Sequence, residues 1–327
     1  MKSLAARTGY IQTSQTVAID AKYKKLKAEG KDVLSLGAGE PDLDTPDHAK
    51  DAAILSIRKG LTKYSAVTGL PDLKAAISAK FARENHLAYP SENITVSSGA
   101  KHCVFNTLLA LVEAGDEVLI PTPGWTTYPE LVKFLGGMPI LLPTEFAEGF
   151  KLKPSQLSAA VTARSKLLIL NSPGNPTGAV YSESELRALA EVAVARDLYV
   201  LSDEIYEHIL YDGAQHVSIA SLGPEIFART ITINGMSKAF AMTGWRIGYV
   251  GAPPVLASAI PVLREVLGEG AVYFDSGSPE DMAEKISVVL GNKKVSEDLA
   301  VRGRANARKY DWLDAAEKTL EIYLHVK

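Results

Sequence analysis

Three residues whose side chains can act together in catalysis stand directly after apolar runs of this sequence. Asp203 ends one such run, Tyr206 follows three residues later, and Lys238 lies in a loop of small residues after another. A carboxylate at the end of a buried strand needs a cationic partner. A lysine amine held partly out of water beside a cationic or aromatic group has a lowered pKa and becomes a nucleophile. Taken singly, Asp203 also fits a helix N-cap, and Lys238 also fits a solvated surface lysine.

Two turns rich in glycine, serine and proline follow other predicted strands. Ser97–Lys101 joins a strand to a helix, and the N–H groups at such a helix start can cradle a phosphate. Arg246, eight residues after Lys238, can fork onto the same anion. Asn171–Gly178 forms a defined loop at a strand end, where open parallel sheets bind ligands. An ordinary strand–helix turn and a structural loop are the alternatives for these two segments.

Four patterns are now named: Asp203 with Tyr206, Lys238 with Arg246, the turn Ser97–Lys101 and the loop Asn171–Gly178. Together they match the needs of one cofactor. Pyridoxal phosphate requires a lysine for its aldehyde, a carboxylate for its pyridine nitrogen and a cup for its phosphate. From about Thr8 to Pro254 the sequence resembles the class I, fold-type-I aminotransferases of the aspartate aminotransferase subgroup. The matching segments are Ser35–Asp42, Tyr64–Gly69, Asn171–Gly178 and Ser237–Gly248.

The resemblance implies a role for each matching residue. Lys238 would bind the cofactor covalently and then shuttle a proton, and Asp203 would pair with the pyridinium nitrogen. Tyr206 and Asn175 would hydrogen-bond the phenolate oxygen of the ring, and Trp125 would stack on its face. Lys238, Asp203 and Tyr206 are thus the expected catalytic residues, and substrate would lie against Gly39, Trp125 and Asn175.

The same resemblance implies a phosphate site and a dimer. The phosphate would be held by Ser237, Arg246 and the backbone of Gly99, Ala100 and Lys101. Tyr64 would reach it from the other subunit of a homodimer. A lysine like Lys101 accompanies acidic substrates in this subgroup, so we expect a ping-pong aminotransferase that takes aspartate or glutamate and a 2-oxo acid. The alternatives are another pyridoxal phosphate reaction, such as β-elimination or decarboxylation, a catalytically idle protein that binds the cofactor, and, remotely, a sugar transferase.

Apolar strand-like runs alternate with helical stretches, which predicts an α/β fold with a mostly parallel sheet. The resemblance specifies this as the large domain of the pyridoxal-phosphate-dependent transferase fold (fold type I). Helices are expected over Val17–Glu29, from Pro71 through Phe81, over Ala100–Glu113 and over Glu183–Arg196, the last with a capping box from Ser182 and Glu185. The expected strands are Val33–Leu36, Ile94–Ser97, Glu117–Ile120, Pro139–Leu142, Lys166–Leu170, Tyr199–Ser202 and Thr230–Ile233.

The resemblance ends at the C-terminal part of the chain. We predict an aminotransferase region over residues 1–254 and a helical extension over 258–327, joined as a fusion near 252–258. The extension resembles the end of a group 1 GT-B glycosyltransferase, with one strand over Ala271–Phe274 followed by three helices. Family members instead carry a small domain there, with an arginine for the substrate α-carboxylate that no residue here matches. We therefore expect an incomplete small domain and impaired turnover.

Composition narrows the class of protein further. The 327 residues are 46% hydrophobic and 22% charged, which excludes a disordered chain. A net charge of −3 gives no basic field for nucleic acid. The single cysteine, Cys103, excludes an intrachain disulfide and a CxxC zinc site. No apolar run is long enough for a membrane span, and the start of the sequence shows no signal peptide, so we expect a cytoplasmic protein.

Overall fold

The structure is a computed structural model of the chain, and it describes residues 9, 15–34, 37 and 39–254. The chain divides into two compact units, Met1–Pro253 and Pro254–Lys327. The fold described below is that of the first unit. The strand predicted at 271–274, the three helices predicted after it and the glycosyltransferase-like segment 258–327 lie outside the described residues.

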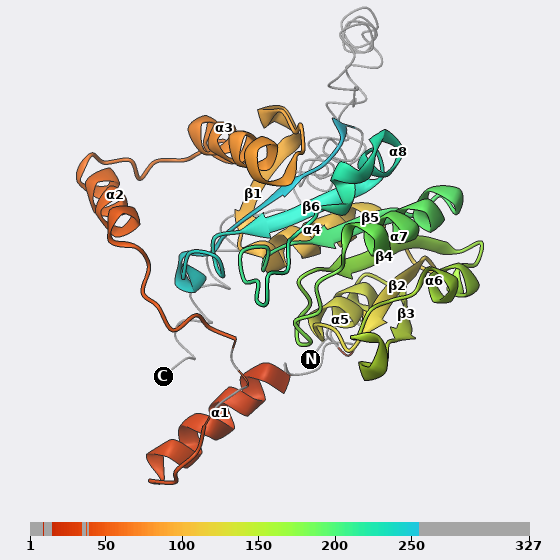
Figure 1. The fold of residues 1–327 in the computed structure, drawn as a ribbon. Helices are drawn as coiled ribbons and strands as arrows, with labels where there is room; N and C mark the ends of the chain where they lie inside the picture. Colours follow the sequence, from red (N-terminus) through yellow and green to blue (C-terminus); the bar gives the residue numbers. More distant parts are fainter. Residues whose placement is uncertain (1–8, 10–14, 35–36, 38, 255–327) are drawn as a thin grey trace, which may run out of the picture. The chain divides into compact units, whose positions relative to one another are not determined.

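A seven-stranded sheet forms the centre of the first unit (Figure 1). Its strand order is β1-β7-β6-β5-β4-β2-β3. Four neighbouring pairs, from β3 through to β6, are parallel, whereas β7 is antiparallel to both β1 and β6. The predicted mostly parallel α/β sheet is therefore confirmed. The strands are β1 (Ile94–Ser98), β2 (Glu117–Thr122), β3 (Met138–Pro143), β4 (Ser165–Asn171), β5 (Tyr199–Asp203), β6 (Thr230–Gly235) and β7 (Ile247–Gly251).

Six of the predicted strands are present close to their predicted bounds, and one prediction is wrong. Val33 and Leu34 belong to no strand, and the side chain of Leu34 is 92% exposed. The run at Val33–Leu36 is apolar, but at Val33 and Leu34 the backbone has no neighbouring strand to pair with, and propensity alone does not make a strand. Ser35 and Leu36, which complete that predicted strand, are outside the described residues.

The helices also follow the sequence where local signals were strong. The Ser182–Glu185 capping box is present at the start of α7, and Pro71 occupies the first turn of α3. A π-helical segment, Phe81–Asn85, continues α3. Four shorter or more exposed helices, α2, α5, α6 and α8, were not predicted. The helices are α1 (Gln15–Ala28), α2 (Asp47–Arg58), α3 (Pro71–Lys80), α4 (Ala100–Leu111), α5 (Thr127–Phe134), α6 (Pro154–Ala160), α7 (Glu183–Ala195) and α8 (Pro224–Phe227).

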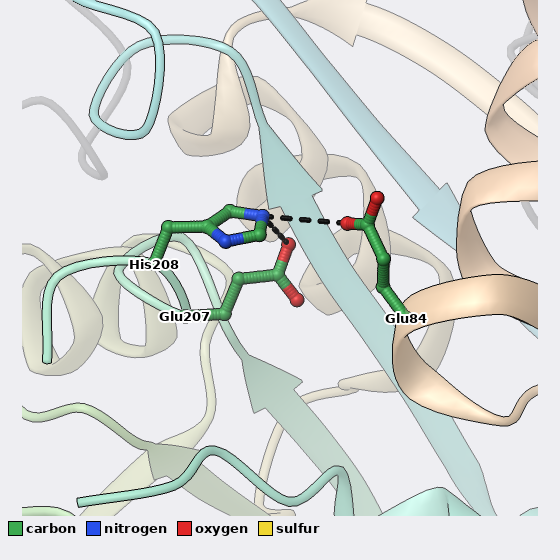
Figure 2. Close-up of side chains that lie close together, drawn as sticks. All are labelled: Glu84, Glu207 and His208. Carbon is green, nitrogen blue, oxygen red and sulfur yellow. Dashed lines mark ion pairs between the residues drawn. The ribbon is translucent and has the colours of Figure 1, made fainter. Parts of the chain in front are cut away.

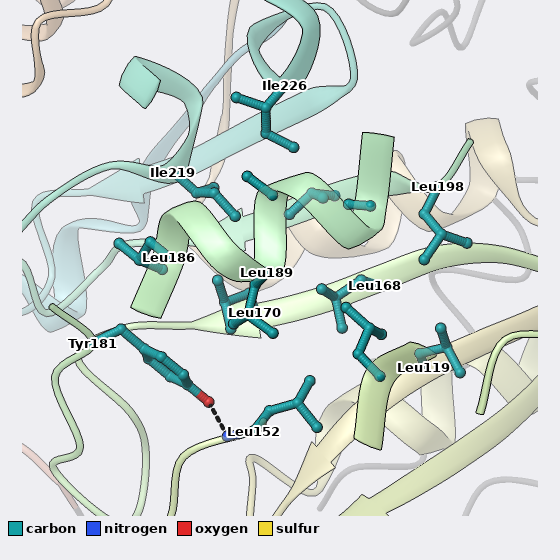
Figure 3. Close-up of a cluster of buried hydrophobic side chains, with 14 of the residues drawn as sticks. Leu119, Leu152, Leu168, Leu170, Tyr181, Leu186, Leu189, Leu198, Ile219 and Ile226 are labelled. Carbon is teal, nitrogen blue, oxygen red and sulfur yellow. Dashed lines mark hydrogen bonds between the residues drawn. The ribbon is translucent and has the colours of Figure 1, made fainter. Parts of the chain in front are cut away.

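Both faces of the central strands are buried, which explains their continuous apolar sequence. Leu168 and Leu170 of β4 pack with Leu186 and Leu189 of α7 in one large apolar cluster (Figure 3). Side chains alternate along a strand, so Leu167 and Ile169 point to the opposite face, and they too are at most 1% exposed. A sheet held in this way is a rigid frame for the loops at its carboxyl edge.

Candidate active site

The carboxyl ends of three adjacent parallel strands bring the main predicted residues together. Asn171 ends β4 and pairs in register with Asp203, which ends β5. The neighbouring strand β6 ends at Gly235, three residues before Lys238. Ligands of open parallel sheets bind at this edge. The fold therefore places a carboxylate, an amide and an amine at one site.

Asp203 is a buried carboxyl group in a largely uncharged setting. Its side chain is 3% exposed, and its Oδ2 atom accepts a 2.6 Å hydrogen bond from the hydroxyl of Tyr128. Oδ1 accepts a 3.3 Å bond from the N–H of Ile205. Burial raises the pKa of Asp203 to about 6 even though both hydrogen bonds oppose the shift, and the charge of Glu204 adds to it. A cation bound next to Asp203 would restore the ionised form.

Tyr206 and Asn175 also meet at this site. The side-chain amide of Asn175 donates a 3.2 Å hydrogen bond to the Tyr206 hydroxyl. The backbone N–H of Asn175 is in turn fixed by Oδ1 of Asn171 at 2.7 Å. Burial and the charge of Asp203 raise the pKa of Tyr206, so its phenol stays protonated at neutral pH. The predicted meeting of these side chains from the Asn171–Gly178 loop and the turn after β5 is observed.

Lys238 is partly buried beside the same tyrosine. Its Nζ lies 6.0 Å from the centre of the Tyr206 ring and donates a 2.5 Å hydrogen bond to the carbonyl of Gly39. Burial lowers its pKa, an effect that the Glu40 charge opposes and the Arg246 charge reinforces. A larger fraction of neutral, nucleophilic amine is therefore present near neutral pH than for a surface lysine. Gly39, predicted to adjoin the substrate, thus lies within reach of the reactive amine.

Arg246 lies against the start of α4, where the sequence predicts an anion cradle. Gly99 is the N-cap of α4 with φ of +86°, and a Cβ atom there would lie 2.4 Å from Nη2 of Arg246. Gly248 is equally constrained, because its Cβ would lie 2.3 Å from the N atom of Ala100. Only glycines let the guanidinium and the helix start approach so closely. Ser237 is buried one residue before Lys238.

Trp125 links the cradle to the buried aspartate. The Lys101 amine lies 5.0 Å from the centre of a Trp125 ring, and Trp125 packs edge-to-face with Tyr128 at 5.2 Å. Burial and the nearby Arg246 charge lower the pKa of Lys101. One connected group therefore contains the Trp125 ring, the cations Lys101 and Arg246, and the hydrogen-bonded pair of Tyr128 and Asp203.

Tyr64 is the one predicted residue that the structure does not bring to the site. Its side chain is fully exposed in the single chain. The prediction assigned it to the partner subunit of a dimer, so a single chain does not test it. Sequence reasoning in turn missed Tyr128, which lies three residues after Trp125 and contacts Asp203 directly. Its only signal was this proximity to Trp125.

Comparison with known proteins identifies the family. The sequence profile of the family "Aminotransferase class I and II" matches residues 31–276. The chain therefore belongs to the class I and II aminotransferase family. It is 50% identical over 260 residues to an aspartate/prephenate aminotransferase of Nitrosomonas europaea, a match covering 79% of this chain and 65% of that protein. Thus the matched part spans just under two thirds of the length of that curated relative.

Solved structures share the fold. An aspartate aminotransferase from Rhizobium meliloti superposes with a TM-score of 0.77 and 44% identity, covering 93% of this chain and 74% of the other. The aspartate aminotransferase of Thermus thermophilus with maleate gives a TM-score of 0.77 and 40% identity, covering 93% and 77%. The predicted fold of pyridoxal-phosphate-dependent aminotransferases is confirmed. Among the described residues, no helix has the length and apolar character needed to cross a membrane.

Proposed function

We propose that this chain binds pyridoxal phosphate and transfers an amino group between an acidic amino acid and a 2-oxo acid. One juxtaposition carries the proposal: the amine of Lys238 and the buried carboxyl of Asp203 follow adjacent strands, and an anion cradle lies beside them. An aldehyde, a pyridine nitrogen and a phosphate on one ring require these three features.

The residues fit that cofactor in charge as well as in type. None of the ion pairs found among the described residues includes Asp203, although it is buried. A protonated pyridine nitrogen would supply the cation that this carboxyl lacks. The phosphate dianion matches the Arg246 guanidinium and the N-terminus of α4.

Pyridoxal phosphate, when bound, supplies a ring that accepts the electron pair left on the substrate Cα atom. The chain's own residues then have distinct tasks. The amine of Lys238 would hold the cofactor through its aldehyde carbon, with loss of water, and, once freed by the substrate amine, would take the proton from Cα. Asp203 would keep a proton on the ring nitrogen. The hydroxyl of Tyr206, oriented by Asn175, would donate a hydrogen bond to the ring oxygen.

An acidic substrate is the second part of the proposal. The relatives are named as aspartate or aspartate/prephenate aminotransferases, and one solved relative has maleate, a dicarboxylate, in its title. In this chain, the charge of Arg246 is close enough to Lys101 to lower the pKa of its amine, so two cations serve one region. We propose that Lys101, above Trp125, attracts the side-chain carboxylate of the donor.

We further propose a homodimer in which Tyr64 completes the phosphate site of the partner subunit. The support is its full exposure in a single chain, which is unusual for a tyrosine. Mixing Tyr64→Phe and Lys238→Ala subunits tests this. A hybrid dimer should regain one site built from intact residues, whereas each variant alone should be weak. The same activity for the mixture as for the sum of the separate variants contradicts the arrangement.

The deciding experiment is an absorbance spectrum of the purified protein with pyridoxal phosphate, recorded before and after adding glutamate. Transamination predicts a change of the cofactor band on adding glutamate alone and its reversal on adding a 2-oxo acid. Turnover without a 2-oxo acid would favour β-elimination or decarboxylation. A cofactor band that does not respond to either addition would favour the idle binding protein.

The glycosyltransferase-like segment 258–327 and the cytoplasmic location stay predictions. The aminotransferase profile reaches residue 276 and so overlaps the first part of that segment. We propose that the segment takes no part in the chemistry at Lys238. Deleting 258–327 should leave borohydride trapping of the cofactor unchanged, and a loss of trapping in a folded protein would show that the segment contributes to the site.

A further inference from the structure

A network of buried charged side chains begins at the residue after Asp203. It joins the turn after β5 to the C-terminal end of α3 and the π-helical segment that follows. Glu204, the residue after Asp203, is 1% exposed, and Glu207 is 5% exposed. Two carboxylates this deep in the protein need compensating charge and hydrogen bonds.

Hydrogen bonds satisfy Glu204 on every side. Oε1 accepts from the hydroxyls of Ser202 at 2.8 Å and Ser218 at 2.7 Å. Oε2 lies 3.0 Å from Nε2 of His216 and accepts a 3.3 Å bond from the amide of Asn85. These partners come from β5, from the 216–218 segment and from the π-helical segment, so Glu204 fixes the turn against its surroundings.

Glu207 is paired with the other cation of the network. Lys80 Nζ forms an ion pair with Glu207 and donates a 2.7 Å bond to Oδ1 of Asn85. Asn85 completes the link by donating to Glu207 at 2.7 Å. Glu204, Glu207 and His216 also have the spacing of metal ligands. Because Lys80 already occupies the Glu207 side, we interpret the group as a charge network.

The charge balance of this network depends on the protonation of His216. Lys80 forms ion pairs with Glu207 and, at 3.7 Å, with Glu84. Among the described residues, His216 is the group that forms an ion pair with Glu204 when it is protonated. The His216 side chain is 8% exposed and faces Glu204, Glu207 at 4.0 Å and, more distantly, Lys80. Burial alone would lower its pKa, but the charge and hydrogen bond of Glu204 and the charge of Glu207 outweigh that and the repulsion of Lys80, so the pKa is raised. No described residue forms a hydrogen bond with the buried Nδ1 atom of His216.

We propose that protonated His216 is a positioning residue for Asp203: it neutralises the adjacent Glu204 and so keeps Asp203 ionised and in place for the cofactor. His216 acts on Asp203 through Glu204. Glu204 is the residue after Asp203, and its negative charge disfavours ionisation of Asp203. The inference about cofactor binding rests on the proposed function, whereas the charge coupling between His216 and Asp203 does not.

His208 provides a matched control. Its Nε2 lies 3.3 Å from Glu84 and 3.5 Å from Glu207 at the outer end of the same network (Figure 2). Unlike His216, its side chain is 44% exposed, so water screens its charge. His208→Gln therefore removes a histidine from the network without uncovering a buried carboxylate.

The test titrates the Asp203 carboxyl carbon by ¹³C NMR in the full-length protein, with the signal assigned by Asp203→Asn. In His216→Gln, whose amide keeps a hydrogen bond to Glu204 but carries no charge, the midpoint should rise by about half a unit or more, at least roughly threefold in the dissociation constant. His208→Gln should leave it in place. In the double variant Glu204→Gln/His216→Gln, the midpoint should return to the wild-type value or below it. An unmoved midpoint in His216→Gln, or a double variant as shifted as the single one, overturns the proposal.

The pKa of His216 itself and the affinity for pyridoxal phosphate provide two further tests. If His216→Gln does not fold, the His216 ring is titrated in the natural chain, and a midpoint at or below the ordinary histidine value of about 6.5 overturns the proposal. At pH 5.5, where the Asp203 carboxyl is largely protonated, pyridoxal phosphate affinity should fall about two- to threefold in His216→Gln and recover in the double variant. An unchanged affinity overturns the positioning role. If the wild-type protein does not bind the cofactor, the proposed function fails, while the Asp203 titration still decides the charge coupling.

Discussion

The hydroxyl of Tyr128 donates a 2.6 Å hydrogen bond to Oδ2 of Asp203, and both side chains are at most 3% exposed. Helix α5 thus supplies a donor to the carboxyl group that ends β5. Burial raises the pKa of this carboxyl to about 6, and the Tyr128 bond works against the rise. Tyr128 is therefore a partner of the ionised form, positioned before any cofactor is present.

Tyr128→Phe should destabilise the fold mainly at neutral pH. Without the hydroxyl, the pKa of Asp203 should rise above about 6, and the loss of a hydrogen bond to a charged group costs about 1.5–3 kcal/mol. At pH 4.5, where the carboxyl is protonated, the loss should be smaller. Urea unfolding at pH 4.5 and 7.5 measures both, with the exposed Tyr211→Phe as control. Equal losses at the two pH values would contradict this account.

Asp203→Asn should remove a pH dependence of stability. The folded pKa of about 6 lies above the ordinary 3.8, so the contribution of this one carboxyl to stability is fully present below pH 4 and is lost as the pH rises through 6. The shift corresponds to an upper bound on the order of 3 kcal/mol. Without cofactor, Asp203→Asn should be the more stable protein at pH 7. Unfolding curves from pH 4 to 7 that run parallel for both proteins would refute it.

The same substitution should separate cofactor attachment from chemistry. The asparagine side chain would keep an oxygen for the N–H of Ile205 but carries no charge to hold a proton on the ring nitrogen. Attachment at Lys238 does not need that charge. Exchange of the substrate Cα proton should fall by orders of magnitude, the effect of losing several kcal/mol of electrostatic stabilisation. Exchange at the wild-type rate, followed by NMR in D₂O, would remove Asp203 from this role.

Borohydride reduction with pyridoxal phosphate should label Lys238 alone. Its amine is partly buried with a lowered pKa and lies beside Tyr206. Lys166 is held by an ion pair to Asp116, and Lys101 lies over Trp125. Peptide mass mapping of the natural chain, Lys238→Ala and Lys166→Ala identifies the labelled residue. Label on Lys101 or Lys166 in the natural chain would show that the covalent site is elsewhere.

Gly99→Ala should weaken cofactor binding by more than its effect on stability. Both Gly99 (φ +86°) and Gly213 (φ +74°) have left-handed backbone, but only at Gly99 would a Cβ meet Arg246. Gly213→Ala should cost about 1–2 kcal/mol of stability. Gly99→Ala should cost more, because φ of +86° with ψ of 162° is a conformation that is essentially restricted to glycine. Only Gly99→Ala should also displace the guanidinium and reduce affinity for pyridoxal phosphate, measured by titration at equal folded fraction. Equal affinities in the two variants would show that the cradle does not hold the phosphate.

The sequence predicted those site residues that follow a strong local signal. Asp203, Lys238 and Asn175 each come soon after an apolar run, so strand ends could be placed and their meeting at one sheet edge followed from parallel topology. Tyr128 and His216 have no such signal. Their partners are chosen by how α5 and the 216–218 segment pack, which depends on contacts across the whole sheet. Tyr64 depends on a second chain. At Val33–Leu36 a local signal was present but misleading. The apolar run predicted a strand, but no neighbouring strand pairs with the backbone at Val33 and Leu34.

The pairing of β1 with β7 has a consequence for when the proposed cofactor site forms. Ile94 pairs with Gly251, so these strands meet only after nearly the whole first unit has been synthesised and has closed into one sheet. Closing so long a loop is slow and entropically costly. Gly99 follows β1 and Arg246 precedes β7, so the anion cradle forms only at that closure. A partly folded chain would expose Lys238 without a phosphate cradle, so tight binding of the proposed cofactor would require the last stage of sheet assembly.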